Sequence, residues 1–231
     1  MNRMLQICTA IIVATGVLFA EEKSVNPGIN KSFENPNVPD FIERFEKEGR
    51  DAFDHRKEIL AALDLKPGMT VADIGTGTGL FARAFAPLVG DEGKVFAVDI
   101  SEKFIHHVEQ TAAGQGLKNI VGVLCEPDRV KLPPNSVDLA FICDTYHHFE
   151  FPASTMRSIH SALKPGAKLI LIDFHRIEGK SSEWAMNHVR AGQEVFTKEI
   201  LAAGFRQIDE KKDLLKESYF VRFERIDLPP K

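Results

Sequence analysis

The sequence predicts an α/β domain whose core is a mostly parallel sheet of seven strands, with helices on both faces. Short apolar runs alternate with segments of helical periodicity from residue 69 to residue 210. A glycine-rich turn joins the first of these strands to the helix after it. The connection 211–218 is too short for a helical crossover, so we expect the last two strands to be antiparallel.

The apolar runs define the strands of this sheet. They are expected at 69–74, 94–98, 120–124, 137–143, 168–174, 205–210 and 219–224. The high Val, Ile, Leu and Phe content of the first five runs is typical of strands that are buried on both faces. Helices are expected at 80–88, 102–113, 152–163 and 197–203, where apolar residues recur at helical spacing. Lys164-Pro165-Gly166 and Gly204 are expected to end the last two helices, because proline and glycine terminate helices.

The first 20 residues have the pattern of a secretory signal peptide. Arg3 precedes an apolar run of 16 residues, Leu5 to Ala20, which ends in a small residue. A membrane-spanning helix needs about 20 apolar residues, so this run is short for an anchor. We therefore expect residues 1–20 to direct export to a periplasmic or secreted location, without stable membrane insertion after cleavage. An uncleaved membrane tether and a buried first helix are the alternatives.

The charge of the chain argues against two classes of partner. The formal net charge is −4, and no stripe of basic residues stands out in the sequence. A protein that binds nucleic acid or an anionic membrane through its surface usually shows such a stripe. We therefore expect no nucleic-acid partner, and a small molecule is the more natural ligand.

The glycine turn after the first strand does not match a dinucleotide site. Its glycines are Gly75, Gly77 and Gly79, and Leu80 stands where Gly-x-Gly-x-x-Gly requires the third glycine. Asp73, just before the turn, would repel a pyrophosphate but suits a ligand with a cationic amine. This spacing disfavours an NAD-dependent oxidoreductase.

A second carboxylate follows the next strand. Asp99 ends the run Ala97-Val98-Asp99, and a carboxylate at the end of the strand beside the first one can accept hydrogen bonds from both ribose hydroxyls. The two strand ends and the turn between them thus offer one carboxylate that can bind an amine, a glycine backbone, and a second carboxylate that can bind a ribose. This set suits S-adenosylmethionine better than NAD.

Four segments resemble the class I S-adenosylmethionine-dependent methyltransferases, in their small-molecule, methyltransferase-domain branch. They are VADIGTGTG, AVDIS, LPPNSVDLAFICDTYHHF and ALKPGAKLILIDF, and the resemblance covers about residues 50–225. It implies a Rossmann-like sheet of order 3-2-1-4-5-7-6, S-adenosyl-L-methionine as cofactor and a small-molecule methyl acceptor. A non-catalytic protein that binds adenosylmethionine or adenosylhomocysteine on this fold is the alternative.

The resemblance also implies where the cofactor would bind. The expected cofactor residues are Asp73, Gly75, Thr76, Gly77, Gly79, Asp99, Ile100, Glu126, Asp128 and Cys143. The glycines would lie beneath the methionine part and Asp99 on the ribose, while Glu126 or Asp128 would meet the adenine amine. A glycine turn that binds nothing is the alternative. Cys125 and Cys143 would end strands that are not neighbours in this order, so we expect two free thiols.

The acceptor is expected beyond the ends of the strands 137–143 and 168–174. Asp144, His147 and His148 follow the first of them and are the candidate catalytic residues. The histidines could take a proton from the acceptor or only line the pocket. A third reading joins Asp144, Asp173, His175 and one of His147 or His148 around a metal ion, although we assign no metal ligand.

The remaining N-terminal residues are expected to form two different parts. Residues 21–40 are rich in Asn, Pro and Ser, which predicts an extended surface segment. The methyltransferase domain would follow at 41–231 and begin with a helical cap, 41–66, in which Gly49 separates two helices. Phe41, Phe45, Phe53, His55 and Arg56 are expected to cover the acceptor pocket.

Overall fold

The computed structural model describes residues 22–227, and the expected sheet of seven strands is present in them. The strands are β1 (Thr70–Ile74), β2 (Lys94–Asp99), β3 (Ile120–Leu124), β4 (Val137–Cys143), β5 (Leu163–Phe174), β6 (Phe205–Glu210) and β7 (Ser218–Arg225). Their order is β3-β2-β1-β4-β5-β7-β6, as predicted. The first five strands are parallel, and β7 runs antiparallel to β5 and β6. The predicted signal peptide, 1–20, lies outside the described residues.

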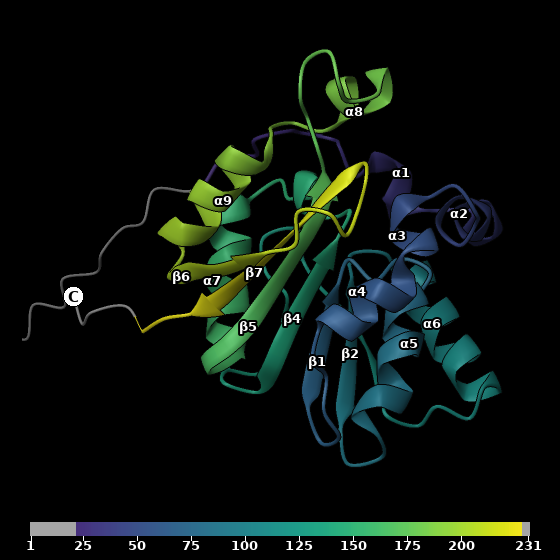
Figure 1. Ribbon diagram of the computed structural model, residues 1–231. Helices are drawn as coiled ribbons and strands as arrows, with labels where there is room; N and C mark the ends of the chain where they lie inside the picture. The colour runs from purple at the N-terminus through teal and green to yellow at the C-terminus, as the bar shows by residue number, and fades with distance from the viewer. Residues whose placement is uncertain (1–21, 228–231) are drawn as a thin grey trace, which may run out of the picture.

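Helices cover both faces of this sheet, as Figure 1 shows. One face carries α4 (Arg56–Ala62), α5 (Leu80–Val89) and α6 (Glu102–Gly114), and the other carries α7 (Pro152–Ala162) and α9 (Gln193–Ala202). Successive strand residues point to opposite faces, so each strand contributes to both cores. In β1, Val71 packs in the core with Phe85, while Ala72 packs in the core with Met156. Burial on both faces explains the continuous apolar runs.

Two elements begin several residues before their predicted start, and one helix was not predicted. β5 begins at Leu163, because Leu163 is buried and pairs with Val137. A bulge before Leu139 accommodates the segment that contains Pro165, so Lys164-Pro165-Gly166 lies inside the strand and does not form a separate turn. α9 begins four residues earlier than expected. The sequence also did not predict α8 (Glu183–His188), which is too short for a helical period to be recognised.

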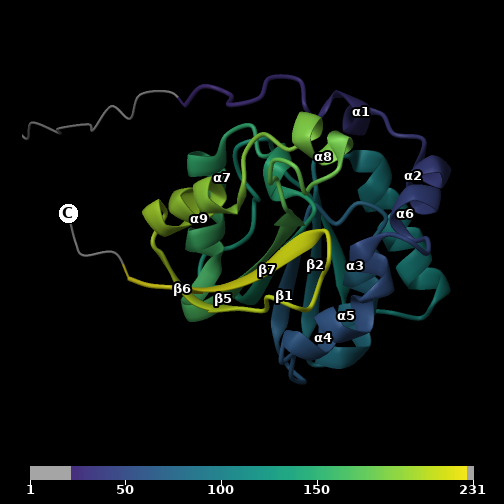
Figure 2. The same ribbon diagram turned by 45° about the horizontal axis from the view of Figure 1, so that its top comes forward.

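The prediction that residues 21–40 form an extended segment is wrong in part. This region contains α1 (Lys31–Glu34) and the start of α2 (Val38–Phe45), whose first turn includes a proline. As predicted, Gly49 lies between two helices, α2 and α3 (Asp51–Asp54). Figures 1 and 2 show α1, α2 and α8 along one edge of the sheet, where the parallel strands end.

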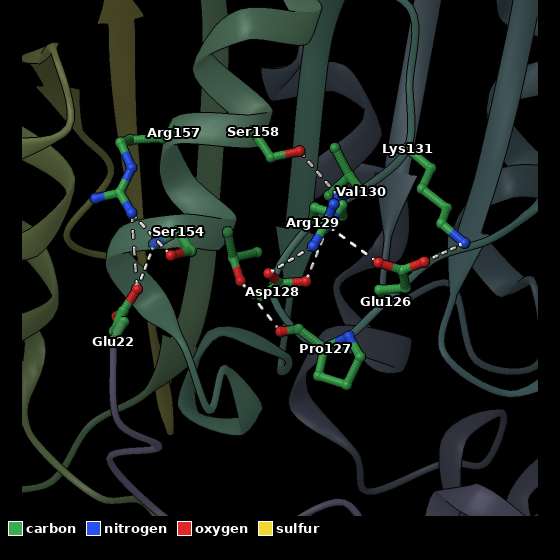
Figure 3. Close-up of polar contacts among 11 residues, drawn as sticks. Glu22, Glu126, Pro127, Asp128, Arg129, Val130, Lys131, Ser154, Arg157 and Ser158 are labelled. Carbon is green, nitrogen blue, oxygen red and sulfur yellow. Dashed lines mark hydrogen bonds and ion pairs between the residues drawn. The ribbon is translucent and has the colours of Figure 1, made fainter. Parts of the chain in front are cut away.

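The N-terminal segment is attached to the domain by specific hydrogen bonds. The carboxylate of Glu22 accepts from the backbone amides of Ala153 and Ser154, at 2.9 and 2.7 Å. It therefore caps the N-terminus of α7, beside Arg157, as Figure 3 shows. The side-chain amide of Asn30 donates to the carbonyl oxygen of His148, at 3.0 Å. Among residues 22–227, no helix has the length and apolar content that crossing a membrane would require.

Candidate functional site

A cavity of about 560 Å³ lies over the carboxyl ends of the parallel strands. Its floor is formed by residues at the carboxyl ends of β1, β2, β3, β4 and β5, and its walls include side chains of α1, α2 and α8. Ligands of open α/β sheets bind at this edge, where the strand order reverses. In this sheet, β1 and β4 form that reversal point, since the chain goes outward to β3 before it returns.

The glycine turn forms one side of the cavity. Gly75 and Gly77 have φ values of 71° and 51°, in the region that favours glycine. A Cβ atom on Gly75 would lie 2.2 Å from Cγ2 of Thr145, so no side chain fits there. Gly79 does not line the cavity. Its Cβ would lie 2.6 Å from the side chain of Val108, so it allows α5 and α6 to pack closely.

Two buried carboxyl groups border the turn. Asp73 accepts a hydrogen bond from the hydroxyl of Thr76, at 2.7 Å, and burial raises its pKa to about 7. Asp99 accepts from the backbone amides of Gly77 and Ser101, both at 2.9 Å. Burial raises its pKa to about 6, against the effect of these donors. Both groups line the cavity, where a cationic or hydroxyl-rich ligand would favour their ionised forms.

The loop after β3 separates the two residues proposed for the adenine amine. Glu126 lines the cavity, and its carboxylate pairs with Arg129 at 3.0 Å and Lys131 at 2.7 Å. Asp128 does not line the cavity and accepts hydrogen bonds from Arg129 (Figure 3). Of these two residues, only Glu126 therefore lies at the cavity where the cofactor is expected. Cys125 is a free thiol, as predicted, and burial raises its pKa to about 12.

His147 and His148 lie on a short 3-10 helix (Tyr146–His148) after β4. Nδ1 of His147 is 2.7 Å from a carboxylate oxygen of Asp173, and both side chains are buried. The backbone amide of His147 donates to the other oxygen of Asp173, at 3.1 Å. Burial, together with the neighbouring imidazoles of His147 and His188, lowers the pKa of His148 to about 2. All three histidines line the cavity.

Asp144 is held by a residue that sequence reasoning missed. A guanidinium nitrogen of Arg50 lies 2.6 Å from Oδ2 of Asp144. The guanidinium also covers the ring of Phe45, 4.9 Å from its centroid. Burial raises the pKa of the Asp144 carboxyl, and the charge of Arg50 opposes that rise. This ion pair fastens the segment between α2 and α3 to the end of β4.

The predicted cap residues divide into two groups. Phe41 and Phe45, on α2, line the cavity together with Phe33 of α1. Phe53, His55 and Arg56 do not line it, so this part of the prediction is wrong. They lie on or between α3 and α4, where the guanidinium of Arg56 covers the ring of Phe53 instead, 4.2 Å from its centroid.

The metal set considered for Asp144, Asp173 and His175 does not form. The backbone amide of His175 bonds the carbonyl of Glu217, and its ring packs against Tyr219, away from the cavity. In residues 22–227, the group of His, Cys, Asp or Glu side chains close enough to share an ion consists of His147, His148 and His188. His188 was missed because it belongs to the unpredicted helix α8. Its spacing of four residues from Trp184 was the available signal, since such residues share a helix face.

The family comparison decides the class of the protein. A family described as a methyltransferase domain matches residues 65–218 of the 231. The chain belongs to this family. The methyltransferase-domain match begins before β1 and ends at the start of β7, so it includes the glycine turn, both buried carboxyls and the histidines.

Individual relatives agree with this family. The ubiquinone/menaquinone biosynthesis C-methyltransferase UbiE of Cupriavidus metallidurans is 28% identical over 118 residues, covering 51% of this chain and 48% of that protein. The chain thus spans about half the length of this relative. UbiE of Shewanella sp. strain W3-18-1 is 28% identical over 184 residues, covering 75% and 72% of the two chains. A crystal structure of a SAM-dependent methyltransferase from Aquifex aeolicus superposes with a TM-score of 0.72 at 28% identity, covering 81% of this chain and 98% of that one.

The chain therefore contains a methyltransferase domain with a Rossmann-like fold, and the cofactor of this family and fold is S-adenosyl-L-methionine. The cavity fits this cofactor, because Gly75 and Gly77 leave space that a Cβ atom would reduce. The carboxyl groups of Asp73 and Asp99 flank that space. S-adenosyl-L-methionine supplies a methyl group on a sulfonium centre, and the chain must bind it, orient the acceptor and exclude water.

Proposed function

We propose that this chain transfers the methyl group of S-adenosylmethionine to a small-molecule acceptor held between β4, β5 and the helices above them. The observation that carries the proposal is the continuity of one cavity. It extends from the glycine turn and Asp99 to the histidines after β4, and aromatic side chains of α1, α2 and α8 form its outer wall. A cavity of about 560 Å³ within these walls suits a small acceptor better than a polymer.

The cofactor would lie across the ends of β1, β2 and β3. Asp73 would receive the amine of the methionine part, with the Thr76 hydroxyl bonded to it, and the backbone of Gly75 and Gly77 would lie beneath that part. Asp99 would accept hydrogen bonds from the ribose hydroxyls.

Three further residues complete the proposed cofactor site. Ile100 and Cys143 line the cavity beside the positions proposed for the ribose and the methionine part, and Glu126 lines it where the adenine would lie. Gly79 would support the site through the packing of α5, whereas Asp128, paired with Arg129 outside the cavity, would not contact the cofactor.

The acceptor would bind beside His147, His148 and Asp144. Methyl transfer from a sulfonium requires a nucleophile that is aimed in line with the bond that breaks. Asp173 fixes the ring orientation of His147, and the aromatic ring of Phe33 packs edge-on against His148 at 4.9 Å. Asp144, paired with Arg50, would keep the cap closed over the acceptor. We therefore assign the two imidazoles to binding and orienting the acceptor's polar atom.

Calorimetry tests the cofactor part of this proposal. The protein should bind adenosylmethionine and adenosylhomocysteine but not NADH. Asp99→Asn should weaken adenosylhomocysteine binding about tenfold to hundredfold, because hydrogen bonds to a charged group contribute about 1.5–3 kcal/mol. Asp128→Asn is the matched control and should leave the affinity unchanged, since Asp128 lies outside the cavity. Binding of NADH without binding of adenosylmethionine would overturn the proposal.

An acceptor screen tests the catalytic part. Each class of small acceptor, including phenols, quinols, thiols and amines, is incubated with adenosylmethionine, and adenosylhomocysteine is measured. The similarity to UbiE makes quinols the first class to test. Product formation that depends on the acceptor supports turnover. Tight cofactor binding with no product from any class would favour the non-catalytic alternative.

We also propose that residues 1–20 act as a signal peptide that is removed. The support is the pattern of Arg3, a 16-residue apolar run and the small Ala20. Glu22 lies just after the proposed cleavage point and caps α7, so a chain that starts at Glu21 would keep this contact. N-terminal sequencing of the protein from its native host checks this. A chain that begins at Glu21 is expected, and an intact Met1 in a membrane fraction would support a tether instead.

A further inference from the structure

We propose that His147, His148 and His188 bind a Zn²⁺ ion at the acceptor end of the cavity. The three residues come from two separate segments, the 3-10 helix after β4 and the helix α8 after β5. One ring nitrogen of each residue lies within 4.8 Å of the other two. The tertiary structure has therefore assembled a three-imidazole group whose members line one cavity.

The spacing of the nitrogens suits a tetrahedral ion. Nε2 of His148 and Nε2 of His188 are 3.3 Å apart. Two nitrogens bound to one tetrahedral zinc at about 2.0–2.1 Å are separated by roughly 3.3–3.4 Å, so this pair already has the required separation. One ring nitrogen of His147 lies within 4.8 Å of the other two ligand nitrogens, so a small movement of this ring would complete the group.

Residues that would not bind the ion themselves orient the histidine rings, as they do in other metal sites. Asp173 bonds Nδ1 of His147, which leaves the other ring nitrogen of His147 to serve as the ligand. A carboxylate in this position orients a metal-bound histidine and raises its basicity. The ring of Trp184 stacks on His188, with centroids 4.8 Å apart and an interplanar angle of 24°. Trp184 thus restricts the ring of His188, and the edge-on contact with Phe33 restricts the ring of His148.

The chemistry of the donors selects the metal. Three neutral nitrogens with no carboxylate ligand favour zinc and similar transition metals over Mg²⁺ or Ca²⁺, which prefer oxygen. Three protein ligands also leave one coordination position open, as catalytic zinc sites do. This last step rests on the proposed function: the open position would bind an oxygen or sulfur atom of the methyl acceptor.

Metal binding is tested directly on the full chain without a polyhistidine tag. The protein is treated with a chelator, dialysed against Zn²⁺, and its zinc content is measured by mass spectrometry. We expect one Zn²⁺ per chain, and bound Co²⁺ should show the visible absorption of a tetrahedral site. His188→Ala should weaken Zn²⁺ binding by at least about tenfold, and Asp173→Asn by about 10- to 100-fold. The matched control is His106→Ala, because His106 is exposed on α6 and should retain full binding.

Three outcomes would overturn the inference. They are no stoichiometric zinc in the wild-type chain, equal binding by His188→Ala, and octahedral rather than tetrahedral cobalt absorption. Circular dichroism checks that each variant is folded, and His188→Ala is the safer variant because α8 lies at the surface. Adenosylhomocysteine affinity of the metal-free protein separates the two proposals. A chain that binds adenosylhomocysteine but fails to bind zinc would overturn the zinc site alone. A chain that binds zinc but not adenosylhomocysteine would overturn the proposed function.

Discussion

Asp73 and Asp99 are carboxyl groups whose pKa values burial moves toward neutrality, to about 7 and about 6. A raised pKa means that the folded protein holds protons which the unfolded chain has released. The free protein should therefore lose stability as the pH rises from about 4 to about 7. The ligand acts in the opposite direction, since an ammonium group and ribose hydroxyls favour the ionised carboxylates.

These shifts predict a pH dependence of cofactor binding. Adenosylhomocysteine should bind tightest above pH 7 and progressively more weakly as the pH falls through about 7 and about 6, because protonated carboxyls must ionise to bind it. Calorimetric Kd values between pH 8 and pH 5 measure this. Asp99→Asn should remove part of the slope, whereas Asp128→Asn should retain it. A constant Kd over this range would contradict the prediction.

Gly75 offers a prediction with a closely matched control. Gly75 and Gly116 have the same φ, 71°, but a Cβ on Gly75 would collide with Thr145 while a Cβ on Gly116 would meet nothing within 4 Å. Gly116→Ala should therefore cost only the strain of a left-handed alanine, about 1 kcal/mol. Gly75→Ala should cost more and should also abolish cofactor binding. Urea denaturation and calorimetry of both variants measure the difference. Equal costs would show that Thr145 moves aside.

At the scale of elements, the cap depends on one ion pair. Arg50 and Asp144 join the segment after α2 to the end of β4, and their side chains are 20% and 7% exposed. Arg50→Gln leaves the carboxyl of Asp144 buried without its partner. We expect a loss of up to about 3 kcal/mol, at the lower end for a buried pair because Arg50 keeps some contact with water.

A double-mutant cycle checks this expectation. Asp144→Asn in the Arg50→Gln background should recover part of the lost stability, because it removes the unpaired charge. Urea denaturation gives the four free energies of unfolding, and limited proteolysis reports whether the cap opens. Additive effects would show that the pair contributes no coupling. Faster cleavage near residues 46–50 is expected for Arg50→Gln alone.

At the scale of the whole molecule, the sheet separates two hydrophobic cores. Ile59 of α4 lies in one core and Ile200 of α9 in the other, and both are fully buried. Each Ile→Val substitution should cost about 0.5–1.5 kcal/mol. Because the sheet lies between the two sites, the double variant should show the sum of the single effects to within about 0.5 kcal/mol. Urea denaturation measures all three. A clear departure from additivity would mean that strain passes through the sheet.

Local sequence patterns were enough to predict most of the strands and helices. Apolar runs set the strands, helical spacing set most helices, and Gly75, Gly77 and the two carboxyls marked the edge where the cavity lies. The motifs also implied the strand order, and the order in the structure is the same. These features could be predicted because they depend on the spacing of apolar residues and on neighbouring residues along the chain.

Contacts between residues that are distant in the sequence could be identified only in the folded structure. Arg50 reaches Asp144 across 94 positions of the chain, and His188 reaches His148 across 40. The structure likewise separates Glu126 from Asp128, which are two positions apart in sequence, and turns His175 away from the cavity. Such contacts depend on how helices pack over the sheet edge, and no periodicity along the chain encodes that packing. The residues proposed to bind the cofactor could therefore be predicted from local motifs, whereas the contacts of Arg50 and His188 could not.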